Sequence, residues 1–189
     1  MNPILDIPSV RARVSRITVE AYHRQPEYNH HRRRTELIRG IVIEKMSKSP
    51  LHTTISSRLY RKILTQIPPE YNAWKEEPLT FADSEPEPDV SVVKGGDADR
   101  QDAHPSTAAL AVEVAVTSPR EDRELALLYA EAGVAEYWVV IPMQRIIEVY
   151  RHSDGTRYLE VHVYRAGETL ECGSVPGVRV ALDELFAGL

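Results

Sequence analysis

The amino-acid sequence predicts an α/β fold of the mixed α+β kind, and three observations lead to this prediction. Short runs rich in β-branched and apolar residues alternate with helical patterns along most of the chain. A strand, a helix and a second strand follow one another over residues 109–141, and such a crossover makes its two strands parallel. Asp154-Gly155 lies between two further predicted strands and is typical of a hairpin turn.

The length and composition describe an ordinary globular protein. The chain has 189 residues, of which 42% are hydrophobic and 27% charged, so we expect one domain over residues 17–189 after an arm at residues 1–16. A single cysteine, Cys172, allows no internal disulfide and fits a reducing cytoplasm. No run of 18 apolar residues and no secretory signal is found. The net charge of −5 argues against a DNA-coating protein but does not exclude a nucleic-acid enzyme, because local basic patches set the field.

The first part of the chain predicts a short helix and a hairpin. Thr18 can cap a helix that begins after it. Two strands are expected over residues 35–46, with their turn at Gly40.

A longer helix and a strand should follow. Over residues 52–67, apolar side chains recur at every fourth position: Ile55, Leu59, Ile63 and Ile67. Pro68 ends this helix, because proline disfavours the helical conformation in the residue before it. Residues 74–81 read as a strand in which Pro78 indicates an edge position.

The central stretch, residues 85–113, carries the most informative pattern. Residues 89–93 and 109–116 read as strands joined by a long polar loop, and the second is nearly all apolar except for Glu113, as in a buried central strand. The helix after it should begin at a capping box that starts with Ser118 and end at Gly133. Beyond it we expect strands at residues 136–141, 145–151 and 157–165 and a short helix at 182–186.

Two acidic residues stand on these neighbouring strands. A carboxylate such as that of Glu113, inside an apolar strand, is costly unless it is hydrogen-bonded, paired or bound to a metal. Asp89 follows a proline and, taken alone, is typical of a turn or cap residue. Together the two acids would repel each other, and a divalent cation relieves such repulsion. Both a structural hydrogen bond and a site for a hard, oxygen-preferring ion such as Mg²⁺ fit the pattern.

Glu87-Pro88-Asp89, followed by Glu113-Val114-Ala115, resembles the PD-(D/E)XK nuclease superfamily. Within it, the chain resembles the Uma-two family of restriction endonuclease-like proteins. The stretches that carry this resemblance run in family order across residues 17–185: Thr35-Glu-Leu-Ile-Arg-Gly, Lys48-Ser-Pro-Leu-His52, Glu85-Pro-Glu-Pro-Asp-Val, Val112-Glu-Val, Asp122-Arg-Glu, Tyr129-Ala-Glu-Ala-Gly-Val and Glu136-Tyr-Trp-Val-Val.

The resemblance implies a fold and a metal site. The fold is a restriction endonuclease-like core, with a mixed central β-sheet flanked by helices and extra N-terminal and C-terminal strands. The site would use Asp89, Glu113 and the backbone carbonyl of Val114 to hold Mg²⁺ or Mn²⁺, with Glu36 as an accessory acid. A solvated position on a strand is the alternative for Glu36.

The resemblance also implies an activity, the hydrolysis of DNA phosphodiester bonds by a metal-dependent endonuclease. Lys48, His52 and Arg123 would contact nucleic acid. The alternatives are a solvated lysine at position 48 and a structural capping role for His52. Pairing of an exposed β edge would make the protein a homodimer.

One position departs from the family pattern. The lysine that the family carries four residues before the tyrosine corresponds here to Leu125, which cannot donate a hydrogen bond and fits simple core packing. Three other cations could replace it: Arg123, Lys94 and Lys48. The alternative is a catalytically inactive nuclease-fold protein that binds nucleic acid or a protein partner.

Overall fold

The computed structural model describes residues 7–25, 35–95, 103–117 and 119–189, which fold into two compact units. The first unit contains residues 1–46 and 82–86, and the second contains residues 47–81 and 87–189. The predicted Ser118 cap and the basic run at residues 30–34 lie outside the described residues. The prediction of one domain over residues 17–189 stays a prediction.

The first unit is built on a hairpin and two short helices. Its elements are α1 (Pro8–Arg11), α2 (Val19–His23), β1 (Thr35–Ile38) and β2 (Ile41–Glu44). Thr18 caps α2 through a 3.2 Å hydrogen bond from the Ala21 amide, as predicted. The hairpin turn places Gly40 at a φ of +73°, which glycine adopts without strain.

A six-stranded mixed sheet forms the centre of the second unit. Its order is β3-β4-β5-β6-β7-β8, made of Tyr71–Trp74, Val90–Lys94, Leu110–Val114, Glu136–Ile141, Ile146–Ser153 and Tyr158–Tyr164. The pair β5–β6 is parallel and the other pairs are antiparallel, so the predicted crossover is confirmed.

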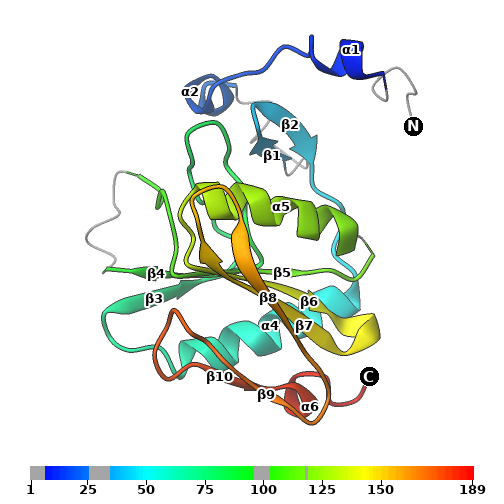
Figure 1. The fold of residues 1–189 in the computed structure, drawn as a ribbon, viewed down its shortest axis with the longest axis vertical. Coiled ribbons are helices and arrows are strands. Elements are labelled where there is room, and N and C mark those ends of the chain that lie inside the picture. Colours follow the sequence, from blue (N-terminus) through cyan, green and yellow to red (C-terminus); the bar gives the residue numbers. More distant parts are fainter. Residues whose placement is uncertain (1–6, 26–34, 96–102, 118) are drawn as a thin grey trace. The chain divides into compact units, whose positions relative to one another are not determined.

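Two helices cover the sheet of this unit, one on each face (Figure 1). Helix α4 (Pro50–Leu64) buries Ile55, Leu59 and Ile63 against one face, together with the small hairpin of β9 (Thr169–Glu171) and β10 (Arg179–Ala181). Helix α5 (Pro119–Glu131) lies on the other face, where Tyr129 stacks on Tyr137 of β6. The chain continues through a 3₁₀ turn, η3 (Pro142–Gln144), and α6 (Leu182–Leu185).

Two predictions about elements need correction. The strand expected at 74–81 is wrong, because β3 ends at Trp74 and the chain turns at Glu76, whose φ is +59°. Helix α4 begins at Pro50 and not at His52, because Ser49 is its N-cap and proline suits the first helical position. None of the helices in the described part of the chain is long and apolar enough to cross a membrane.

Candidate active site

The two predicted acids occupy opposed backbone positions where strands β4 and β5 run side by side. Strands β4 and β5 pair with Val90 opposite Val112, so one residue further Asp89 lies opposite Glu113. The Val114 amide donates a 2.8 Å hydrogen bond to Oδ2 of Asp89, which confirms that the two chain segments remain adjacent there. Asp89 is 5% exposed, and Glu113 is half-buried. The structure therefore brings Asp89, Glu113 and Val114 together.

Two positively charged or hydrogen-donating side chains reach Asp89 from helix α4 and the loop before it. Nζ of Lys48 lies 2.9 Å from Oδ1 of Asp89, and Nε2 of His52 lies 2.9 Å from Oδ2. The Ser49 cap fixes the first turn of α4, because it accepts a hydrogen bond from the His52 amide. The predicted site residues Lys48 and His52 thus contact Asp89, and the cap of α4 is Ser49 and not His52.

These contacts change the acidity of Asp89. Burial alone raises the pKa of a carboxyl group, since it disfavours the charged form. At Asp89 the hydrogen bonds and positive charge of His52 and Lys48 outweigh burial, and the pKa falls below its usual value. Asp89 is therefore a carboxylate at neutral pH and can serve as an oxygen ligand.

Glu76 is a member of the site that the sequence did not indicate. Its Oε1 lies 3.1 Å from Nζ of Lys48 and 2.7 Å from Nζ of Lys75. Its backbone φ of +59° is uncommon for a residue other than glycine, asparagine or aspartate, and it turns the chain after β3. Because glutamate rarely adopts this conformation, the residue type at position 76 does not predict the turn.

Glu113 is oriented by helix α5. The hydroxyl of Tyr129 donates a 2.9 Å hydrogen bond to Oε1 of Glu113. Beside it, burial together with the charge of Glu113 raises the pKa of Tyr137 well above its usual value, so Tyr137 stays neutral. The signal for Tyr129 is its place on the buried face of α5, because a buried phenol needs a hydrogen-bond partner.

Arg123 and Glu36 have other partners. The guanidinium of Arg123 binds Glu148 through two hydrogen bonds, of 2.8 and 2.6 Å. Glu36 belongs to the first unit, where its carboxylate accepts a 2.7 Å hydrogen bond from Lys45. The nucleic-acid contact expected of Arg123 and the accessory role expected of Glu36 stay predictions.

The donor atoms at Asp89 and Glu113 suit a hard cation. No group of three His, Cys, Asp or Glu side chains is placed to hold a metal ion within the described ranges. Mg²⁺ does not require such a group, since it commonly binds one or two carboxylates and keeps several water molecules. A carboxylate oxygen can accept two hydrogen bonds or ligands, so Oδ1 of Asp89 retains an acceptor position beside Lys48.

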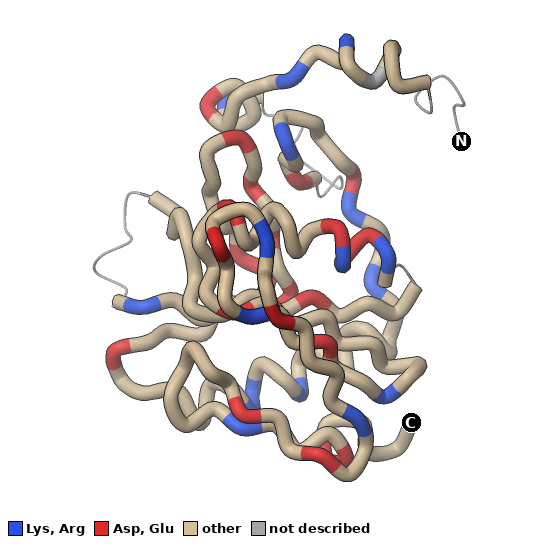
Figure 2. The backbone as a smooth tube through the Cα atoms, in the orientation of Figure 1, with Lys and Arg blue, Asp and Glu red and all other residues tan. Residues whose placement is uncertain are grey.

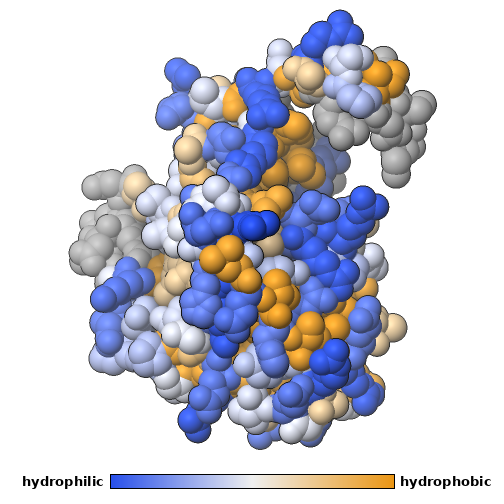
Figure 3. Space-filling model, viewed as in Figure 1, coloured by the Kyte–Doolittle hydropathy of each residue, from blue (hydrophilic) through white to orange (hydrophobic). Residues whose placement is uncertain are grey.

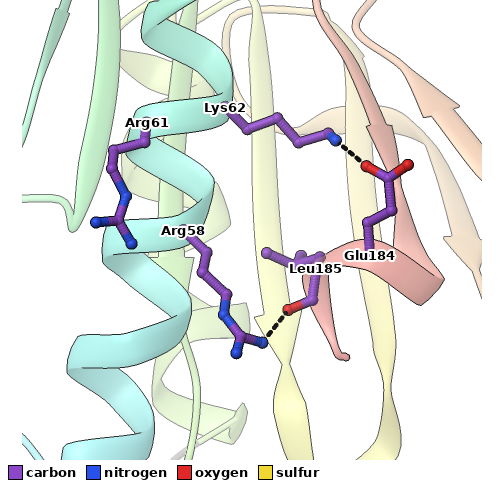
Figure 4. A pocket seen from close by; sticks show the side chains of 5 residues that line it. All are labelled: Arg58, Arg61, Lys62, Glu184 and Leu185. Carbon is purple, nitrogen blue, oxygen red and sulfur yellow. Dashed lines mark hydrogen bonds and ion pairs between the residues drawn. The ribbon is translucent and has the colours of Figure 1, made fainter. Parts of the chain in front are cut away.

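A surface pocket of about 240 Å³ lies between α4 and α6 and shares no lining residue with the acid pair (Figure 4). Arg58 in this pocket donates to the carbonyls of Leu185 and Ala187, and Lys62 pairs with Glu184. Because Arg58 and Lys62 bind the C-terminal segment, we assign them a structural role. The candidate active site is therefore the group of polar side chains around Asp89.

Comparison with known proteins bears on the fold and the family of this chain. A solved crystal structure, described as "a putative nuclease belonging to DUF820" from Anabaena variabilis ATCC 29413, superposes with a TM-score of 0.76. It is 20% identical in sequence, and the match covers 90% of this chain and 97% of that chain. The predicted restriction endonuclease-like fold is therefore confirmed. A search of the curated proteins finds no match. The model of the family described as "Uma2: Putative restriction endonuclease" matches residues 19–183, so the chain belongs to the Uma2 family.

Proposed function

We propose that this protein is a metal-dependent endonuclease that hydrolyses phosphodiester bonds in DNA. Membership of the Uma2 family supports nuclease activity in general. The single observation that carries the proposal is the position of Asp89 opposite Glu113, with the Val114 amide bonded to Asp89. Two carboxylates on rigid strands form a preset pair of oxygen ligands, as metal-assisted hydrolysis requires.

Asp89, Glu113 and the carbonyl of Val114 would hold Mg²⁺ or Mn²⁺. When bound, such an ion supplies Lewis acidity, which makes water more acidic and offsets negative charge on the phosphate. The rest of the site fixes the two ligands: Tyr129 orients Glu113, and His52 and the Val114 amide hold Oδ2 of Asp89.

DNA binding would depend on local cations. Acidic and basic residues are interspersed along much of the backbone of the second unit (Figure 2), whereas helix α4 carries Arg58, Arg61 and Lys62 and no acidic residue. With a net charge of −5, the protein offers no general attraction to a polyanion. Lys48 and His52 lie at Asp89 and are cationic or donor groups that could contact a phosphate bound there.

We further infer that the protein is a homodimer, formed by the outer edge of β8. Leu159 and Val161 of this strand are 62% and 52% exposed, and apolar surface follows the course of β8 in Figure 3. An antiparallel pairing of two copies centred on Val161 sets Glu160 opposite His162 of the second copy. The edge can therefore pair with a second copy of itself, with a carboxylate opposite an imidazole on each side of Val161.

The activity is tested with purified protein on supercoiled, linear duplex, single-stranded and branched DNA, with Mg²⁺, Mn²⁺ or EDTA. We expect cleavage that needs either ion and is lost in Asp89→Asn and Glu113→Gln. Glu171→Gln, which changes an exposed carboxylate on β9, is the matched control and should cleave like the wild type. Absence of cleavage by the wild type on all four substrates with both ions would refute the proposal.

A further inference from the structure

The candidate active site lacks the lysine that its family carries at the position of Leu125, and the structure identifies a replacement. Leu125 is half-buried on α5 and has no polar atom in its side chain. A phosphate transition state gains negative charge, and a nearby cation commonly stabilises it. Three residues could supply that cation: Arg123, Lys94 and Lys48.

Geometry separates the three. Lys94 ends strand β4, whereas Asp89 precedes its start, and at about 3.3 Å per residue the two lie roughly 16 Å apart along the strand. The guanidinium of Arg123 is held by both carboxylate oxygens of Glu148. Lys48 donates a hydrogen bond to an acid of the site, at 2.9 Å from Oδ1 of Asp89.

We propose that Lys48 is the catalytic cation of this protein, in place of the lysine that Leu125 replaces. This inference rests on the proposed endonuclease function. The ammonium of Lys48 has three donor positions, of which one is directed to Asp89 and one to Glu76. The third can donate to a phosphate oxygen, since the side chain remains 20% exposed.

Neighbouring charged side chains fix the position of Lys48. Glu76 approaches Lys48 because its own backbone adopts the left-handed conformation, at a φ of +59°. Such a conformation costs free energy and persists where the surrounding contacts determine it. On its other side, Lys75 binds the same oxygen of Glu76 at 2.7 Å. The row Lys75–Glu76–Lys48–Asp89 thus fixes the ammonium next to the metal ligand.

The chemistry requires no proton from Lys48. In hydrolysis, a water oxygen bonds to phosphorus and one phosphorus–oxygen ester bond breaks. One water proton ends on the departing alcohol, and the other leaves the new phosphate for solvent. Lys48 donates hydrogen bonds and contributes its positive charge throughout, and it is chemically unchanged at the end of the reaction.

The test compares Lys48→Met, Leu125→Lys and the double variant with Lys62→Met as the matched control, since Lys62 is a lysine of α4 that pairs with Glu184 and not with Glu76 or Asp89. Cleavage should fall about a hundredfold in Lys48→Met, as when one transition-state donor is removed. It should recover at least about tenfold in the double variant and change little in Lys62→Met. Lys48→Arg, which keeps the charge, should retain part of the activity and guards against a folding defect.

Mn²⁺ titration supplies a second readout. The affinity of Lys48→Met for Mn²⁺ should be equal to or tighter than that of the wild type, because an ammonium no longer competes for Oδ1 of Asp89. Parallel loss of Mn²⁺ binding and cleavage would make Lys48 a structural support of Asp89 and overturn the inference. Unchanged cleavage in Lys48→Met, with an active wild type, would overturn it while leaving the proposed function intact. A wild type that cleaves nothing refutes the proposed function and this inference with it.

Discussion

The hydroxyl of Tyr129 on α5 donates a 2.9 Å hydrogen bond to Oε1 of Glu113 on β5. The ring of Tyr129 is fixed on two sides, since it stacks on Tyr137 at 4.7 Å and meets Phe81 edge-on at 6.0 Å between ring centroids. A rigid donor of this kind restricts the Glu113 carboxylate to one orientation. Helix α5 therefore sets the direction of a proposed metal ligand without contacting the ion.

Tyr129→Phe should weaken Mn²⁺ binding several-fold and lower the free energy of unfolding by about 1 kcal/mol, the usual net value of one hydrogen bond. The ring and its packing are retained, so the fold should survive. Urea unfolding and Mn²⁺ titration measure the two effects.

The matched control for this substitution is Tyr158→Phe. The Tyr158 hydroxyl donates a 2.8 Å hydrogen bond to the Val134 carbonyl, which is also buried but does not involve the acid pair. Tyr158→Phe should lose about as much stability as Tyr129→Phe and should keep the wild-type affinity for Mn²⁺. If Tyr129→Phe binds Mn²⁺ as tightly as Tyr158→Phe does, Tyr129 does not orient the ligand.

The sequence predicts the acid pair because strand periodicity and order are local properties. An apolar run interrupted by one carboxylate predicts β5 with Glu113, and the crossover to β6 follows from the helix between them. Antiparallel pairing of two consecutive strands then brings Asp89 opposite Glu113. These steps need no knowledge of distant contacts.

The cationic half of the site could not be predicted in this way. Lys48 and Asp89 are 41 positions apart in the sequence and meet only because α4 packs on the sheet. Glu76 takes a positive φ that its residue type does not favour, and the same turn explains why the strand predicted over 74–81 is wrong. At Glu76, tertiary contacts therefore override the local conformational preference of the residue.

The ion pair of Glu148 and Arg123 predicts a loss of stability in acid. The hydrogen bonds from Arg123 lower the pKa of Glu148, against an opposing effect of burial, and Tyr150 contributes in the same direction as Arg123. A carboxyl group with a lower pKa in the folded than in the unfolded state stabilises the fold above the unfolded pKa, about 4.3. This contribution disappears as pH falls through the folded value.

Glu148→Gln should therefore be less stable than the wild type by about 1 kcal/mol near neutral pH, a low value because Arg123 is partly solvated. The difference should shrink as pH falls below about 4. Urea unfolding at several pH values measures it, with Glu171→Gln, an exposed partner of Arg179, as the control that changes little. A difference that stays constant into acid would show that packing, not charge, stabilises Glu148.

Arg58 connects α4 to the C-terminal segment. Its guanidinium donates to the carbonyl oxygens of Leu185, at 3.1 Å, and Ala187, at 2.7 Å (Figure 4 draws the first of these bonds). Carbonyls at the end of a helix such as α6 lack partners within the helix, so this cation satisfies them.

Arg58→Ala should lower the free energy of unfolding by about 1–3 kcal/mol, the range for hydrogen bonds to a charged group. Amide exchange should become faster over residues 182–189 in particular. Arg61→Ala is the control, because Arg61 lines the same pocket and Figure 4 marks no bond from it to the residues drawn. Equal exchange rates in the two variants would contradict a role for Arg58 in holding the C-terminal segment.

The edge of β8 predicts a variant that separates the proposed homodimer. In the antiparallel pairing centred on Val161, this residue faces its own copy across the two-fold axis. Val161→Lys therefore places two ammonium groups directly opposite each other, where like charges destabilise a strand pair.

We expect the wild type to sediment as a dimer and Val161→Lys as a monomer at the same concentration. Met143→Lys replaces another exposed apolar residue of the second unit, on η3, and should remain dimeric. A monomeric wild type, or a Val161→Lys variant that stays dimeric, would exclude this pairing, because Glu160 lies opposite His162 only in the register that sets Val161 opposite its own copy.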